Sequence, residues 1–315
     1  ILEHQDVRVM VMTTGDDILI LLRLPLGWST DYLRTLTAVK LQALTTDDEH
    51  PNGINYLERL ITGATHSHSH PGRFWHVLPG LGLGTVGHGE FSGEMVDRYS
   101  TVFAQTIKDA LDNLQPARVG WSILDEFDPE RRIHSNRRPQ TPNSVDDRML
   151  VWRIESMDGT PLAGLLNFAI HGTHMQKTWV TGDVAGAIER IATDELSAMA
   201  NRLAPVMFFN GNAGNVSPRG DDGVAVSWGK MQAVGHRINR LFKEQWAEIE
   251  PRAEVALEVV HRRIPVTYDR LGYDASIPEF RDNLDQPYTY GGFFCVPEDR
   301  PEENPWEDGD LNCLL

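Results

Sequence analysis

Short apolar segments alternate with amphipathic segments along most of the chain, and this alternation limits the folds open to it more than any other feature. The apolar segments have the length and composition of strands: residues 7–12, 17–26, 117–124, 149–155, 162–170, 205–209 and 255–262. The amphipathic segments have helical periodicity: residues 31–44, 91–114, 184–199 and 227–245. Strands separated by helices predict an α/β fold, with a layered sheet, flanking helices and an active site at the carboxyl ends of strands.

Length and composition indicate how much of the chain belongs to this fold. With 315 residues, 41% of them hydrophobic, the chain can form a substantial core. The periodic pattern predicts one α/β catalytic domain over residues 1–265. Residues 266–315 are rich in Pro, Asp and Glu without periodicity, which predicts a loop-rich tail or the start of a missing segment.

Charge and hydropathy exclude two classes of function. Lysine and arginine total 29 against 45 aspartate and glutamate residues, a net charge of −16 that disfavours nucleic-acid binding. No segment has the roughly 18 to 20 uninterrupted apolar residues of a transmembrane helix. The two cysteines, Cys295 and Cys313, lie close together near the end of the sequence, which favours an oxidising compartment and predicts a secreted or periplasmic protein. Whether they pair is left open.

A histidine-rich segment follows the apolar pair Leu60-Ile61. In an extended chain, His66, His68 and His70 would project to one side, and neutral imidazole is the commonest transition-metal ligand. Zinc is the expected ion for such a nitrogen-rich site, and the alternative is a solvated loop. His171 directly follows the predicted strand 162–170, so the carboxyl ends of two strands can bring His66 and His171 together.

Two further loops contain polar groups suited to catalysis. Ser217 stands before Pro218 in a run of Asn and Gly residues after the strand 205–209, which suits either a positioned hydroxyl or an ordinary polar turn. Arg137 and Arg138 lie in a polar loop, where a guanidinium can bind a carbonyl or oxyanion or simply face solvent.

These segments, in this order, resemble the motifs of the neutral ceramidases, zinc-dependent amidases that cleave the N-acyl bond of ceramide. The matching segments are Thr65–Gly72, Asn136–Pro139, His171–Thr173 followed by Thr181–Asp183, and Asn212–Pro218. The resemblance extends from residue 6 to about residue 265, the amino-terminal catalytic part of that family.

The resemblance implies a role for each of five residues. His66 and His171 would ligate Zn²⁺, and His68 would sit beside the metal or the substrate. Arg137 would contact the polar end of a lipid or small-molecule amide substrate, and Ser217 would attack the amide. Zinc can also activate a water for the same reaction, and the sequence does not choose between these routes.

Three departures from the family pattern affect this interpretation. The Glu and Tyr that complete the family's zinc site are not found in this chain, so either a longer protein or a second polypeptide would supply the remaining ligands. His70 replaces a Gly, which either adds a ligand or crowds the loop. Arg138 replaces a Ser beside the expected substrate contact.

Two other functions fit part of this pattern. A metal-dependent ester or phosphoester hydrolase would need two metals and bridging carboxylates, and only Asp183 lies near a candidate motif. A non-catalytic binding domain could retain the fold and a partial metal site.

Overall fold

The computed structural model describes residues 6–46, 53–74, 91–137, 145–175, 179–220 and 226–262. The chain divides into two compact units, one of residues 1–71 and 94–259 and the other of residues 72–93 and 260–315. Nearly all of the described residues belong to the first unit. The predicted tail, residues 266–315, lies outside the described residues.

A three-stranded sheet forms the amino-terminal half of the first unit. Its strands are β1 (Arg8–Thr14), β2 (Asp17–Leu24) and β3 (Leu60–Ala64). β2 pairs antiparallel with β1 and parallel with β3, and all its residues except the first are buried, as its unbroken apolar sequence predicts. The helices of this half are α1 (Asp31–Thr45), the short α2 (Tyr56–Arg59) and α3 (Gly93–Asp112).

A four-stranded sheet forms the other half. Its order is β4 (Ala117–Leu124), β6 (Met149–Ser156), β7 (Pro161–Phe168) and β8 (Val206–Asn210). The first two pairings are antiparallel, and β7 and β8 run parallel. The helices of this half are α4 (Asp183–Ala200) and α5 (Ser227–Glu248), which share a large apolar core with the sheet.

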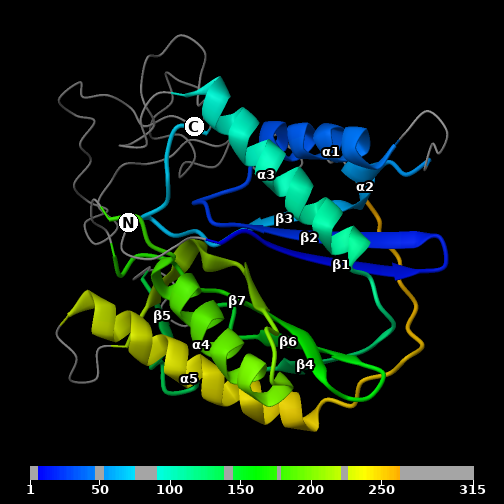
Figure 1. The fold of residues 1–315 in the computed structure, drawn as a ribbon. Coiled ribbons are helices and arrows are strands. Elements are labelled where there is room, and N and C mark those ends of the chain that lie inside the picture. Colours follow the sequence, from blue (N-terminus) through cyan, green and yellow to red (C-terminus); the bar gives the residue numbers. More distant parts are fainter. Residues whose placement is uncertain are drawn as a thin grey trace, which may run out of the picture. The chain divides into compact units, whose positions relative to one another are not determined.

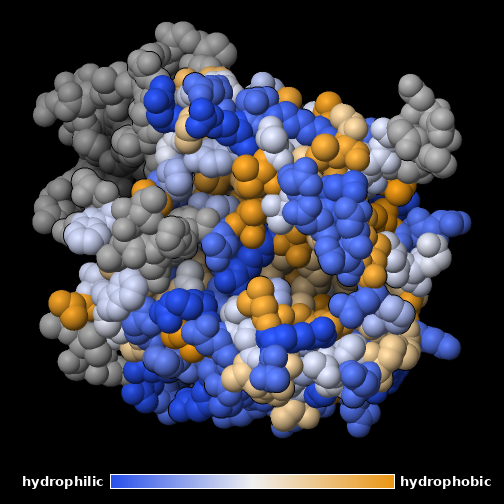
Figure 2. Space-filling model, viewed as in Figure 1, coloured by the Kyte–Doolittle hydropathy of each residue, from blue (hydrophilic) through white to orange (hydrophobic). Residues whose placement is uncertain are grey.

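Within this unit the two sheets lie between two pairs of helices (Figure 1). α1 and α3 cover the three-stranded sheet, and α4 and α5 cover the four-stranded sheet. An apolar cluster joins the sheets, with contributions from both: Met10, Leu19, Leu21, Ile154, Leu165 and Met207. Figure 2 shows the same view, with hydrophilic residues over much of the coloured part of this face. The predicted α/β class, with sheets flanked by helices, is confirmed.

One predicted strand is wrong. Residues 255–262 form no strand; the segment before them meets β4 only at an isolated bridge between Val119 and Arg252. Leu257 and Val259 nevertheless pack against the cluster between the sheets. Side-chain packing therefore accounts for the alternating apolar pattern without a hydrogen-bonded ladder.

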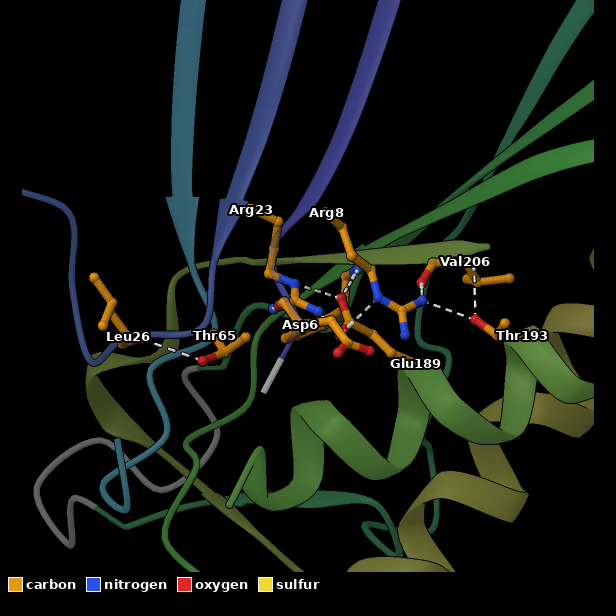
Figure 3. Close-up of polar contacts among 9 residues, drawn as sticks. Asp6, Arg8, Arg23, Leu26, Thr65, Glu189, Thr193 and Val206 are labelled. Atoms are coloured by element: carbon orange, nitrogen blue, oxygen red, sulfur yellow. Dashed lines mark hydrogen bonds and ion pairs between the residues drawn. The ribbon is translucent and has the colours of Figure 1, made fainter. Parts of the chain in front are cut away.

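A buried ion pair links the two halves of this unit (Figure 3). Arg23 of β2 donates from Nε to Oε1 of Glu189 in α4 over 2.7 Å, and a second bond joins its Nη2 to Oε2. The two side chains are 3% and 2% exposed. The backbone N–H of Phe208 in β8 also donates to Glu189, over 2.8 Å. One carboxylate thus binds a strand from each sheet to the same helix.

Candidate metal and catalytic site

Three histidines converge at the carboxyl ends of parallel strands. His66 follows β3, His171 follows β7, and their Nε2 atoms lie 2.9 Å apart. The ring of His68 lies 5.0 Å from each of the other two rings, measured between centroids. One nitrogen from each imidazole lies within 4.8 Å of the other two. The structure thus brings together the two strand ends that the sequence placed at one edge.

Backbone carbonyls fix the orientation of two of these rings. His66 Nδ1 lies 2.7 Å from the carbonyl oxygen of Gly27, and His171 Nδ1 lies 2.7 Å from that of Ala213. Because a carbonyl oxygen only accepts, each Nδ1 carries the proton and each Nε2 presents its lone pair to the cluster. This is the arrangement by which proteins prepare histidines for a metal, so the donor set fits a transition-metal ion.

The electrostatics of the site favour the neutral, ligating form of His66 and His171. Burial lowers the pKa of His66, and the guanidinium of Arg137 lowers it further, against the hydrogen bond to Gly27. Burial, followed by the proximity of His66, lowers the pKa of His171 to about 3. Both rings are therefore neutral at neutral pH, with a proton on Nδ1 and a free lone pair on Nε2.

The histidine segment is a loop rather than the extended strand that the sequence suggested. His66 has a positive φ of 58°, and Ser67 pairs with Gly172 in an isolated parallel bridge. His68 N donates to the Gly172 carbonyl over 2.8 Å. A Cβ on Gly172 would lie 2.6 Å from His66 O and 2.7 Å from Ser67 Cα, so only glycine permits this approach.

Asn210 and Asp183 hold the segment around His171. The side chain of Asn210 makes the two hydrogen bonds to Ile170 that a neighbouring strand would make. Its Oδ1 accepts from Ile170 N over 3.1 Å, and its Nδ2 donates to Ile170 O over 2.8 Å. The fully buried Asp183 accepts from the backbone N–H groups of His174, Met175 and Val184. Sequence reasoning missed both roles, although an Asp at a helix start is a signal for binding backbone N–H groups.

A two-stranded ribbon brings Arg137 to the cluster. β5 (His134–Asn136) pairs antiparallel with β9 (Val216–Pro218), with Ser135 opposite Ser217. Arg137 extends the ribbon, since its N donates to Asn215 O over 2.9 Å. Its Nη2 lies 3.1 Å from His171 Nε2 and donates to Gly214 O over 3.1 Å.

Ser217 lies on the same ribbon. Residues two apart on a strand face the same side, so the half-buried Ser217 is a diagonal neighbour of Arg137. Among the described residues, Ser217 makes no hydrogen bond to the three histidines. The ribbon thus brings Arg137 to the histidine cluster, and Ser217 lies next to Arg137 on the same face of the ribbon, further from the histidines.

The other sequence candidates do not join the cluster. His70 is buried, with its ring edge-on to Trp28 at 5.2 Å, so it crowds the loop and is not part of the three-histidine group. Arg138, Cys295 and Cys313 lie outside the described residues. No helix among the described residues is both long enough and apolar enough to cross a membrane.

Comparisons with known proteins identify related chains. No family model matches the sequence. Neutral ceramidases A and B of Dictyostelium discoideum are 27% and 28% identical to it over 209 residues, which is 60% of this chain and 28% of each relative. The chain therefore spans little more than a quarter of the length of these curated relatives.

Solved structures give the same result for the fold. The crystal structure of neutral ceramidase from Pseudomonas aeruginosa matches with a TM-score of 0.60 and 21% identity, over 75% of this chain and 37% of that one. A ceramidase complexed with C2 matches with the same TM-score and 20% identity, over 73% and 36%. Sequence and fold agree, and the resemblance of this chain to the neutral ceramidase family, first indicated by its four motifs, is confirmed.

Proposed function

We propose that this chain belongs to a zinc-dependent amidohydrolase that cleaves the N-acyl bond of ceramide or a related lipid amide. The observation that carries the proposal is the pair of Nε2 lone pairs from His66 and His171, each oriented by a backbone carbonyl. The choice of an amide as the bond that is cleaved rests on the relatives, which are named neutral ceramidases.

Each site residue has a role in this proposal. His66 and His171 hold the zinc ion, with His68 beside it as a third imidazole. When bound, the ion supplies Lewis-acid polarisation of the amide carbonyl. Arg137 donates hydrogen bonds to the oxygen on which negative charge develops, and its anchoring to the ribbon through Asn215 holds it in place. Ser217 Oγ attacks the amide carbon, the C–N bond breaks, and the amine leaves with the hydroxyl proton. Water then hydrolyses the acyl ester, which releases the fatty acid and restores the serine hydroxyl.

The remaining predictions concern partners and location. A second polypeptide that completes the metal site gains no support from the structure or the comparisons. A secreted or periplasmic location stays a prediction, because it rests on cysteines outside the described residues.

The alternative of an ester or phosphoester hydrolase is less favoured. In the described part of the chain, the metal-ligating group consists of imidazoles alone, without a bridging carboxylate. The carboxylate of Asp183 accepts from three backbone N–H groups and is committed to the loop. A two-metal site of the usual phosphoesterase kind therefore lacks its acidic ligands here.

Elemental analysis combined with an amidase assay tests the proposal. We expect one zinc per chain and release of the amine from an N-acyl sphingoid base in detergent micelles. Ser217→Ala should retain zinc and lose turnover, and His66→Ala should lose both. His236→Ala, at an exposed position on α5, is the matched control and should lose neither. Bound zinc without turnover would favour the non-catalytic binding domain, and absence of zinc would refute the proposal.

A further inference from the structure

The imidazole of His70 covers the backbone of Gly27, the residue whose carbonyl orients His66. A Cβ on residue 27 would lie 2.7 Å from His70 Cδ2, and closer still to its Nε2. The ring therefore occupies the space that a side chain at position 27 would need. His70 is only 8% exposed, and its Nδ1 lies 2.6 Å from the carbonyl oxygen of Pro71.

Gly27 lies in a segment that runs beside the histidine loop. Thr65 N donates to Leu24 O and His66 N donates to Leu26 O, each over 3.1 Å. Thr65 Oγ1 also donates to Leu26 O, over 3.2 Å. These bonds bring the Gly27 carbonyl within reach of His66, but they leave its direction to the packing around Gly27 itself.

His66 depends on this packing because its own backbone is strained. Its φ of 58° is in the left-handed region, which costs a non-glycine residue about 1 kcal/mol or more and persists only where neighbours enforce it. Among the described contacts, the Gly27 carbonyl is the acceptor that fixes Nδ1 of this ring. A shift of that carbonyl would free the ring to rotate or to exchange tautomers.

We propose that His70 is a positioning residue for the metal site. By filling the space over Gly27, its ring holds the Gly27 carbonyl where it accepts from His66 Nδ1, which keeps the Nε2 lone pair of His66 directed at His171. The part of this inference that concerns metal affinity rests on the proposed function. The part that concerns the tautomer of His66 does not.

NMR of the histidine rings and zinc titration test the two parts separately. In metal-free protein, long-range ¹⁵N–¹H correlation should show a single Nδ1–H tautomer for His66, and a mixture in His70→Ala. The zinc Kd, measured by competition with a chelator, should rise about 10- to 100-fold in His70→Ala, as it does for other groups that orient a ligand. His70→Phe restores a ring over Gly27 and should recover most of both properties.

Two controls separate positioning from stability. Ile238→Val, in the core of α5, lowers stability and should leave the His66 tautomer and the zinc Kd unchanged. If His70→Ala does not fold, His70→Val removes the ring with a smaller loss of volume and gives the same comparison. An unchanged His66 tautomer in the ring-deleted variant overturns the proposal. A wild-type protein that binds no zinc refutes the proposed function, while the tautomer still decides the role of His70.

Discussion

Loss of the negative charge on Glu189 should be among the most damaging single changes in this chain. Glu189→Gln keeps the shape of the side chain and an acceptor for Phe208 N, but it leaves the guanidinium of Arg23 buried without a counter-charge. Breaking one side of a buried pair typically costs about 3 to 5 kcal/mol, against a total stability of about 5 to 15 kcal/mol. We expect the variant to lose about a fifth or more of its free energy of unfolding.

A double-mutant cycle tests whether the unpaired charge of Arg23 causes this loss of stability. Arg23→Met combined with Glu189→Gln removes the fully buried unpaired charge and leaves only Arg8, whose Nε lies 3.5 Å from Glu189 Oε2 and whose side chain is partly exposed. Well-packed apolar replacements of buried pairs are often nearly neutral. The double variant should therefore be more stable than Glu189→Gln alone, with a coupling of about 2 kcal/mol or more. Urea unfolding followed by circular dichroism measures each corner. A double variant as unstable as the sum of the two single losses would refute the reasoning.

Three further predictions concern the surroundings of the site. Burial lowers the pKa of His134, so below about pH 6.5 the unfolded chain binds a proton that the folded protein does not, and stability falls with acidification. His134→Gln should reduce that loss between pH 7.5 and 5.5 in urea titrations. Asp183→Ala should cost about 2 to 4 kcal/mol because three backbone N–H groups lose their acceptor, and hydrogen exchange should speed up at Met175. Gly172→Ala should weaken zinc binding at least about tenfold by calorimetry, since its Cβ meets backbone, whereas Gly214→Ala, with open space, should not.

The sequence predicted those parts of the molecule that periodicity encodes. The longer strands and helices of both halves follow from their apolar spacing, whereas α2 and β3 were not assigned from it. The meeting of His66 with His171 follows from the rule that ligands bind at the carboxyl ends of strands. The ribbon of β5 and β9 was not predicted, because strands of three residues are too short to show alternation. The role of the Gly27 carbonyl as the hydrogen-bond acceptor for His66 could not be predicted either, since every residue has a backbone carbonyl.

The same limit explains the remaining differences. The alternation in residues 255–262 predicted a strand, yet apolar packing of Leu257 and Val259 produces that pattern without a ladder. The spacing of two residues between His66, His68 and His70 was interpreted as an extended segment, but His66 has a positive φ, and the ring of His70 packs against Trp28. Periodicity reports which side chains are buried, whereas hydrogen-bond partners and turns depend on segments distant in the sequence.

The separation of His66 and His171 by 105 positions has a consequence for folding. Each histidine follows a parallel strand pair of its own sheet, so neither half contains the site alone. Contacts between such distant positions form late in folding, because the chain must first meet the entropic cost of closing a long loop. The imidazoles can chelate an ion together only once the halves have docked, and a metal that binds the native pair would stabilise that last step most. Zinc added during refolding would then slow unfolding more than it speeds the formation of either sheet.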